Sequence, residues 1–242
     1  MANPVNYSRE LEKIIADNRE QGRLPALLLQ VCCAPCSSYC LEYLREDFRI
    51  TVLYYNPNIS EQAEYEKRKA EELRLIDAYN RQVEEQNFEG MHSSARAQKI
   101  QVMDCPYERE VYEQAVRGLE DCREGGDRCS VCFALRLGKT AQLAAEGGFD
   151  CFTTTLTISP LKDAARLNRI GEEMGQKYGV PWLPSDFKKK NGYKRSIELS
   201  QQFGLYRQNY CGCRFSRRQR EEEILEKQKT AAAEAAGKGK RE

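Results

Sequence analysis

The sequence contains very little histidine and no long hydrophobic run. Its 242 residues include one histidine, His92, which lies in a polar stretch and is expected to occupy a solvated loop. Metal sites and acid–base schemes that require several imidazole groups are therefore excluded. No run of about eighteen apolar residues occurs, and residues 1–24 are polar and charged, so neither a membrane span nor a secretory signal is expected. We expect a cytoplasmic protein without a membrane partner.

The chain also lacks an excess of charge of either sign. It has 38 lysine and arginine residues against 37 aspartate and glutamate residues, which gives a formal net charge of +1. A chain so closely balanced has no overall field that attracts nucleic acid. Any nucleic-acid binding must therefore come from a local patch of basic residues.

Short apolar runs alternate with longer helix-forming segments along most of the chain. The patterns predict strands at 26–31, 50–55, 99–103 and 149–155, and a short extended piece at 180–183. They predict helices at 1–23, 60–86, 108–120, 129–146, 164–178 and 195–203, with Ser60 as the N-cap of the second. Strands that alternate with helices indicate parallel β-α-β units. The predicted fold class is therefore α/β.

The end of the chain differs in composition from the rest. From residue 217 onward the sequence is charge-mixed and then alanine-rich, with too few apolar residues to bury. We predict a single α/β catalytic domain over residues 1–216 and a disordered or helical tail over residues 217–242.

Eleven cysteines are an unusual number for a reducing compartment, where closely spaced thiols more often bind metal or carry out redox chemistry than form structural disulfides. Three groups stand out. They are Cys32, Cys33, Cys36 and Cys40; Cys129 and Cys132; and Cys211 and Cys213. Cys105, Cys122 and Cys151 stand alone, and we expect them, with Cys40, to be structural.

The first cysteine group follows directly on the first predicted strand. In an open parallel sheet this position is the carboxyl edge, where ligands gather. A loop shaped by Pro35 can turn the sulfurs of Cys32, Cys33 and Cys36 toward a common metal ion. The alternative is that each cysteine is a small buried apolar residue, which three cysteines within five positions make improbable.

The other two groups differ in spacing. Cys129 and Cys132 lie at the start of a predicted helix, which places both sulfurs on one face and lowers the pKa of the thiols. Together with the first group, they could hold tetrahedral zinc or a four-iron cluster, and spacing does not separate these. Cys211 and Cys213 are separated by one glycine, so they could form a reducible disulfide or supply further metal ligands.

Polar and aromatic residues accompany the cysteines. Basic groups can neutralise phosphate and aromatic rings can stack on unpaired bases, although a solvated basic loop or an ordinary turn accounts for such residues equally well. The candidates for substrate binding are Asn56, Tyr65, Arg68, Lys162, Asp186, Lys188, Tyr193, Lys194 and Arg207.

Six motifs in order resemble the QueH family of epoxyqueuosine reductases. They are VCCAPCS, YYNPNI with Tyr65 and Arg68 downstream, CSVCFALRL, TTTLTISPLKD, SDFKKKNGYKRS and YRQNYCGCRFS, and they span residues 26–216. The resemblance implies a Rossmann-like, nucleotide α-hydrolase-like sheet. It also implies the reduction of epoxyqueuosine to queuosine at the wobble position of tRNA, with an electron donor that the sequence does not identify.

The same resemblance implies roles for the cysteines. Cys32, Cys33, Cys129 and Cys132 would ligate a 4Fe-4S cluster, and Cys211 and Cys213 would form a redox-active pair. Cys36 occupies a position that suits a further iron ligand. The resemblance leaves open whether an additional iron ion lies beside the cluster.

Two other functions share parts of these sequence patterns. ATP-dependent tRNA thiolases with a similar sheet carry a glycine-rich phosphate loop after the first strand, and this chain has cysteines in place of those glycines. A zinc-binding tRNA-recognition module without redox activity would use the same four cysteines as a closed site. The sequence alone does not distinguish this module from a reductase.

Overall fold

The computed structural model describes residues 5–238 and contains a parallel sheet of four strands in the order β3-β2-β1-β4. The strands are β1 (Ala26–Gln30), β2 (Arg49–Leu53), β3 (Gln101–Met103) and β4 (Cys151–Thr154). β1 is central and pairs in parallel with both β2 and β4. The predicted α/β fold is confirmed, and the strand order is that of the first four strands of a doubly wound sheet.

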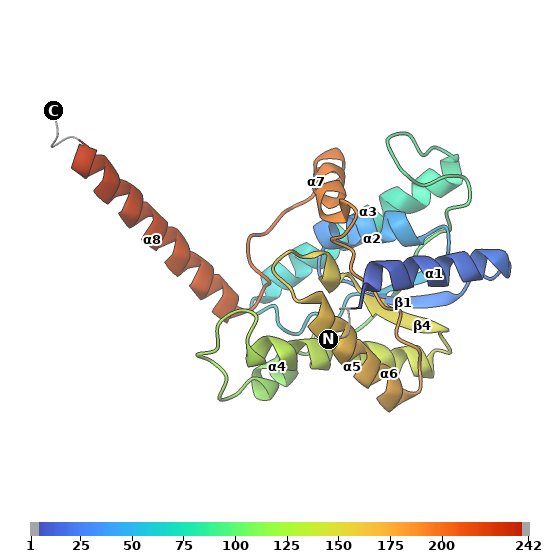
Figure 1. Cartoon of the computed structure of the whole chain (residues 1–242), viewed down its shortest axis with the longest axis horizontal. Helices are drawn as coiled ribbons and strands as arrows, with labels where there is room; N and C mark the ends of the chain where they lie inside the picture. Colours follow the sequence, from blue (N-terminus) through green and yellow to red (C-terminus); the bar gives the residue numbers. More distant parts are fainter. Residues whose placement is uncertain (1–4, 239–242) are drawn as a thin grey trace.

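Helices cover both faces of this sheet (Figure 1). They are α1 (Tyr7–Glu20), α2 (Ala34–Leu44), α3 (Gln62–Glu85), α4 (Arg109–Ala115), α5 (Asp127–Glu146), α6 (Ala164–Tyr178), α7 (Gly192–Gln202) and α8 (Arg214–Lys238). Leu27 and Leu29 of β1 pack in one core with α1, α2 and α3, whereas Leu28 packs with Ala141 and Ala144 of α5. Burial on both faces explains why this strand is a continuous apolar run. None of the described helices combines the length and apolar composition needed to cross a membrane.

The order of the strands creates a crevice at one edge of the sheet. β1, β2 and β3 extend the sheet to one side, and β4 then pairs with the other side of β1. The carboxyl ends of the two strands that flank such a reversal frame the usual ligand crevice of a parallel sheet. Cys32 lies just beyond β1 and Thr155 just beyond β4, and the Cys32 backbone N–H donates to Thr155 Oγ1 at 3.3 Å. The fold therefore brings the first cysteine group to this crevice.

The structure corrects the prediction that residues 32–36 form a loop. Cys33 is the N-cap of α2, a helix that the sequence patterns did not predict, and Cys36 lies in its first turn. Pro35 is compatible with this position because the first helical turn does not use its backbone N–H groups. Of the first cysteine group, Cys32 and Cys33 lie in the connection between β1 and α2, whereas Cys36 and Cys40 lie in the helix.

Other predicted boundaries also need correction. Glu61, not Ser60, is the N-cap of α3, and the Ser60 hydroxyl instead accepts a hydrogen bond from the Arg214 N–H at 2.8 Å. β3 and β4 are shorter than predicted, α4 ends at Ala115, and α7 begins at Gly192. A short 3-10 helix, η1 (Thr155–Ile158), follows β4 and was not predicted.

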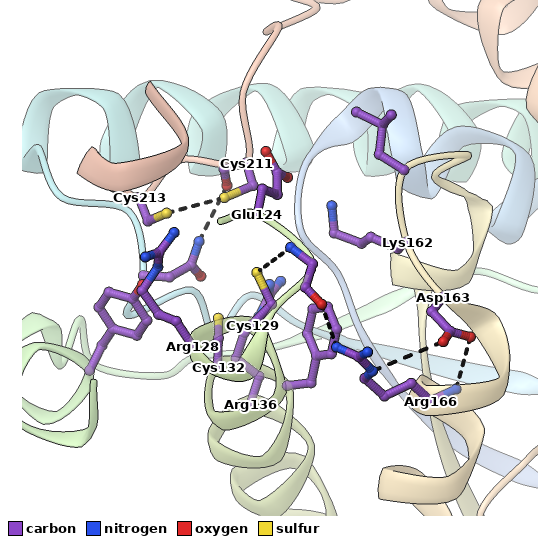
Figure 2. A pocket seen from close by; sticks show the side chains of 15 residues that line it. Glu124, Arg128, Cys129, Cys132, Arg136, Lys162, Asp163, Arg166, Cys211 and Cys213 are labelled. Atoms are coloured by element: carbon purple, nitrogen blue, oxygen red, sulfur yellow. Dashed lines mark hydrogen bonds and ion pairs between the residues drawn. The ribbon is translucent and has the colours of Figure 1, made fainter. Parts of the chain in front are cut away.

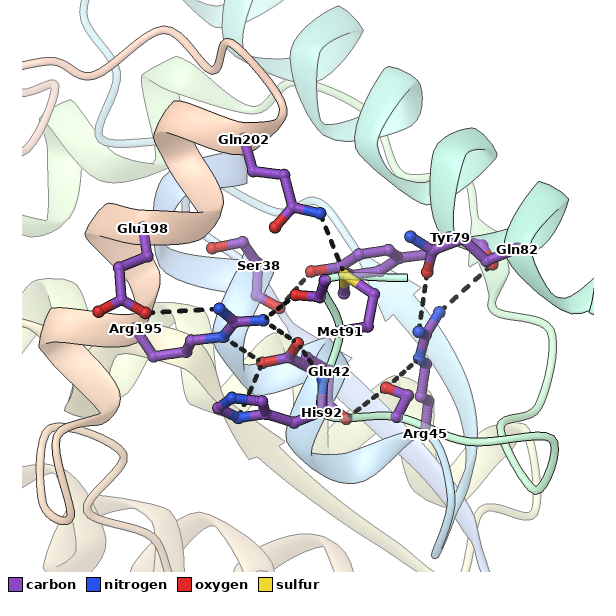
Figure 3. Close-up of polar contacts among 12 residues, drawn as sticks. Ser38, Glu42, Arg45, Tyr79, Gln82, Met91, His92, Arg195, Glu198 and Gln202 are labelled. Carbon is purple, nitrogen blue, oxygen red and sulfur yellow. Dashed lines mark hydrogen bonds and ion pairs between the residues drawn. The ribbon is translucent and has the colours of Figure 1, made fainter. Parts of the chain in front are cut away.

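An ion pair between the half-buried Arg195 and the buried Glu42 joins α7 to α2 (Figure 3). Arg195 of α7 donates to the two carboxylate oxygens of Glu42 of α2 at 2.7 and 3.0 Å, and to the carbonyl of Gly90 at 2.7 Å. His92 lies in the adjoining loop with a largely exposed ring, as predicted, and its backbone N–H also donates to Glu42. Because α2 begins at the cysteines, these bonds place α7 at a defined distance from them.

The predicted tail is helical over its described residues. α8 leads away from the sheet (Figure 1), and the boundary predicted at residue 216 falls in its first turn. The Ser216 hydroxyl donates to Glu124 at 2.9 Å, and Gln219 accepts from the Glu124 backbone N–H at 2.9 Å. These bonds tie the start of α8 to the loop before α5. Residues 239–242 of the predicted tail lie outside the described residues.

Gly171 of α6 lets the sole tryptophan pack against the helix, which leads to a stability prediction. A Cβ atom at residue 171 would lie 2.3 Å from the Trp182 ring. We expect Gly171→Ala to lower the free energy of unfolding by about 2 kcal/mol, because the half-buried Trp182 ring cannot move aside without losing its hydrogen bond to Asn168 and its packing on Phe152. Urea denaturation followed by the fluorescence of Trp182 measures the change. In Gly138→Ala the new Cβ would meet the flexible Met174 sulfur at 3.3 Å, so this control should change stability by less than about 1 kcal/mol. Equal effects of the two substitutions would contradict the prediction.

Candidate active site between strands β1 and β4

Cys32, Cys33 and Cys36 form a compact thiol group at the crevice. Their sulfur atoms all lie within 4.8 Å of one another, and those of Cys32 and Cys33 are 3.8 Å apart. Among the described residues no other group of three or more cysteine, histidine, aspartate or glutamate side chains is close enough to hold a metal ion by the same measure. The prediction that these three sulfurs can face a common ion is thus supported by their geometry.

The three thiols of this group differ in pKa. Hydrogen bonds from Cys33 and Cys36 lower the pKa of the Cys32 thiol well below its usual range, and the charges of Arg136 and Lys162 lower it further. The hydrogen bond to Cys32 raises the pKa of Cys33 to about 12, and the pKa of Cys36 is raised for the same reason. One negative charge is therefore stabilised on Cys32. A deprotonated sulfur is the form that binds metal.

Cys129 and Cys132 lie in the first two turns of α5, as predicted. The Cys129 sulfur accepts a hydrogen bond from the backbone N–H of Gly125 at 3.2 Å. Cys132 is buried, and burial raises its pKa to about 12. The helix start does not lower the pKa of either thiol, in contrast to the prediction, because burial outweighs it. Neither sulfur belongs to the group formed by Cys32, Cys33 and Cys36.

Cys211 and Cys213 lie at the end of the segment that leads into α8 (Figure 2). Their sulfurs are 3.4 Å apart and share a hydrogen bond. Gly212 between them has φ +111°, and a Cβ there would lie 2.8 Å from Ile59 Cγ1, so this turn requires glycine. The carbonyl of Cys211 accepts from the Asn58 amide at 3.2 Å and from Arg68 at 3.4 Å. Several independent contacts therefore hold the pair in one conformation.

The acidity of Cys211 leads to a prediction about its reactivity. The hydrogen bond with Cys213 lowers the pKa of Cys211 to about 6, with burial opposing the shift and the charge of Lys162 adding to it. We expect the rate of iodoacetamide labelling of Cys211 to rise with pH through a midpoint near 6, measured by mass spectrometry of the labelled peptide. Lys162→Met should move this midpoint to higher pH, because it removes the cation that favours the thiolate. A midpoint at or above that of free cysteine, roughly 8.5, would contradict the prediction.

All three cysteine groups line two adjoining cavities. Cys129, Cys132, Cys211 and Cys213 line the first cavity, and Cys32, Cys33, Cys36 and Cys211 line the second. The two cavities share five lining residues, which are Glu124, Arg136, Leu161, Lys162 and Cys211. Seven of the eleven cysteines thus surround one continuous region, and Cys211 faces both parts of it.

Four of the nine predicted substrate-binding residues line the second cavity. They are Arg68, Lys162, Tyr193 and Arg207. The other five, which are Asn56, Tyr65, Asp186, Lys188 and Lys194, line neither cavity. The four that line it come from α3, the turn after η1, α7 and the segment before α8, so only the tertiary fold brings them together.

The five predicted residues outside the cavities have other environments. Asn56 and Tyr65 are buried, and Tyr65 donates to the Tyr54 carbonyl at 3.4 Å. Asp186 pairs with Lys188 at 2.9 Å, and the lysine also reaches the carbonyl of Lys162, so the pair supports the turn before α6. Lys194 is exposed on α7 and lines a separate hollow together with α1 and α2.

Glu124, Arg136 and Ser216 belong to this site and were not predicted from the sequence. Asn58 and Ser216 hold the Cys211–Cys213 turn, since the Ser216 hydroxyl accepts from the Cys211 N–H and its own N–H donates to the Cys213 sulfur, both at 3.3 Å. Arg136 could have been found from its spacing, because it lies four residues after Cys132 and so on the same helix face. Glu124 has no comparable signal in the sequence.

The four cysteines predicted to be structural lie away from both cavities. Cys40, Cys105 and Cys151 are buried in the apolar cores on the two faces of the sheet, and Cys122 is half-buried in the loop before α5.

Comparison with known proteins agrees with this geometry. The family model described as epoxyqueuosine reductase QueH matches residues 27–219. The chain is 38% identical to epoxyqueuosine reductase QueH of Streptococcus pyogenes serotype M1 over 97% of this chain and 87% of that protein. It is 36% identical to the protein of the same name from Staphylococcus epidermidis, over 88% and 84%, and 34% identical to that from Thermotoga maritima, over 83% and 94%. The chain belongs to the QueH family of epoxyqueuosine reductases.

Proposed function

We propose that this chain is an oxidoreductase that reduces epoxyqueuosine to queuosine at the wobble position of tRNA, the last step of queuosine formation. The observation that carries the proposal is the set of seven cysteines around two adjoining cavities at the crevice between β1 and β4. A reductase needs an electron source beside its substrate, and Cys211 lines both cavities. Membership of the family supports the same reaction.

The Cys211–Cys213 pair has the electron and proton stoichiometry that the reaction needs. Loss of the epoxide oxygen as water leaves a carbon–carbon double bond and consumes two electrons and two protons. Oxidation of two thiols to one disulfide releases two electrons and two protons, and the two sulfurs lie 3.4 Å apart. An electron donor outside this chain must then reduce the disulfide, so sustained turnover requires such a donor.

The other site cysteines suit a metal–sulfur group. All are free thiols, and histidine is absent from the lining of both cavities. Sites made only of thiolates hold zinc or iron–sulfur clusters. In this proposal Cys32, Cys33, Cys129 and Cys132 hold a 4Fe-4S cluster, which would supply electrons singly. Cys36 lies beside Cys32 and Cys33 and is available to an additional iron ion.

The second cavity offers both charge and aromatic surface to a nucleotide. Arg207 supplies positive charge, whereas the charge of Arg68 is paired with Glu64 at 2.7 Å, and Tyr193 and Tyr210 supply rings on which a base can stack. The Arg68 guanidinium lies 5.0 Å from the centre of the Tyr210 ring, and Arg207 donates to Ser200 Oγ at 2.8 Å. This combination is typical of proteins that bind unpaired RNA bases, as a wobble nucleotide requires.

The test is an anaerobic reaction with tRNA that carries epoxyqueuosine. Purified protein is incubated with this tRNA and a low-potential reductant, and the nucleosides are then separated and identified by mass. We expect queuosine to replace epoxyqueuosine, and brown protein that contains iron and acid-labile sulfide. Colourless protein with only zinc and no conversion would overturn the proposal and favour a zinc-binding tRNA-recognition module.

A further inference from the structure

Arg136 is a buried cation at the junction of the two cavities. It is 3% exposed, lies on α5 one turn after Cys132, and lines both cavities (Figure 2). All three cysteine groups line these two cavities, so the Arg136 guanidinium borders the same space as each of them. It therefore occupies a central place in the site although it carries no sulfur.

A chain of hydrogen bonds fixes the position of Arg136. Its Nη2 donates to Asn56 Oδ1 at 2.6 Å, and the Asn56 amide donates to the carbonyl of Val31 at 2.9 Å. Gln30 donates to the same carbonyl at 2.8 Å and accepts from Thr154 Oγ1 at 2.6 Å. Val31 immediately precedes Cys32. The ends of β1, β2 and β4 thus hold the guanidinium in a fixed place beside the first cysteine group.

The charge of Arg136 has no carboxylate partner within the described part of the chain. No carboxylate lies within ion-pair distance of it, and its buried Nε–H has no acceptor. Glu124 lines both cavities, but one of its oxygens accepts from Ser216, and Glu124 is not paired with Arg136. A buried guanidinium without a counter-charge is unfavourable, and the negative group that the cavity offers it is the Cys32 thiolate.

We infer that Arg136 is the fixed counter-charge of the thiolate-held metal–sulfur group and keeps its reduction potential high enough to accept electrons. This inference rests on the proposed function. Reduction adds one negative charge to the group, and a buried cation stabilises the reduced form more than the oxidised form. Arg136 is a positioning residue in this role, because it acts on the electron carrier and not on the substrate. Asn56, predicted from the sequence to bind substrate, acts through Arg136.

The test is a redox titration of anaerobic protein, followed by the visible absorbance and the paramagnetic resonance signal of the cluster. We expect Arg136→Met to lower the midpoint potential. At the wild-type midpoint, the ratio of reduced to oxidised cluster should fall at least about tenfold, which corresponds to about 59 mV for one electron. Arg136→Lys, which keeps the charge, should restore most of the shift.

Arg45 provides the matched control (Figure 3). It is fully buried, but its three nitrogens donate to Ser93, Tyr79 and Gln82, and it lines neither cavity. Arg45→Met should lower stability and leave the potential unchanged. An unchanged potential in Arg136→Met would overturn the inference while leaving the proposed function intact. Arg136→Met could also lose its iron, and Arg136→Lys then decides. Iron retained in Arg136→Lys at a near wild-type potential supports the inference, whereas loss of iron from both variants overturns it. Absence of any reducible centre in the wild type would overturn both proposals.

Discussion

Replacement of Cys211 by serine is expected to abolish queuosine formation, with a fall in turnover of at least about a thousandfold. The serine hydroxyl occupies nearly the same space but cannot form a disulfide with Cys213, so the two electrons that the pair supplies are no longer available. Its proton also leaves only at far higher pH than that of Cys211, whose pKa lies at about 6. Turnover is measured by nucleoside analysis of the treated tRNA, with a chemical reductant in excess.

The iron and sulfide content of the same variant separates two possible roles of Cys211. An electron-exchanging residue should leave this content near that of the wild type, because the four proposed ligands are intact. Loss of iron would instead make Cys211 a ligand, and turnover near that of the wild type would remove the redox pair from the proposal. Cys122→Ser is a suitable control, since Cys122 is half-buried and lines neither cavity.

The second large effect concerns the metal ligands. We expect Cys32→Ser and Cys129→Ser each to reduce iron and acid-labile sulfide at least about tenfold, because a thiolate ligand is lost from a site whose other ligands cannot replace it. One substitution lies beyond β1 and the other in α5, so equal losses would indicate that one group spans the two cavities. The measurement is elemental analysis together with the visible spectrum of anaerobically purified protein.

Cys36→Ser distinguishes the proposed ligand set from the alternative in which the three closest sulfurs, those of Cys32, Cys33 and Cys36, hold the metal. Cys36 lies with Cys32 and Cys33 within 4.8 Å, whereas Cys129 and Cys132 do not belong to that group. If the cluster is held by Cys32, Cys33, Cys129 and Cys132, Cys36→Ser should retain the cluster spectrum. A variant that loses its metal on replacement of Cys36 but keeps it on replacement of Cys129 would identify Cys32, Cys33 and Cys36 as the metal site instead.

Several features of the fold could be predicted because their signals are local. The run at β1 is apolar without alternation because both of its faces are buried, and α6 matches the predicted range 164–178. By contrast, α2 was missed because cysteine, serine and proline are poor helix signals. Its formation depends on packing: Cys40, Leu41 and Leu44 are fully buried against the sheet.

The residues predicted to bind substrate also divide into those whose position the sequence indicates and those that only the packed chain places. Arg68 and Arg207 line the cavity, whereas Asn56 and Tyr65 are buried behind it. A polar residue after a strand has the same sequence signal whether it contacts a ligand or holds a neighbouring side chain. Arg136 was missed although its spacing places it on the same helix face as Cys132, because an arginine in a helix is normally solvated.

The sequence by itself determined the parallel α/β fold and the three cysteine groups of this protein, because apolar periodicity and cysteine spacing are properties of short segments. The tertiary structure alone decided which cysteines share a cavity. Cys32, Cys129 and Cys211 belong to distant segments, and they meet because β4 pairs beside β1 and α8 begins at the same crevice. It also decided that Arg136 is buried among them without a carboxylate partner, since burial and ion pairing are properties of the packed chain.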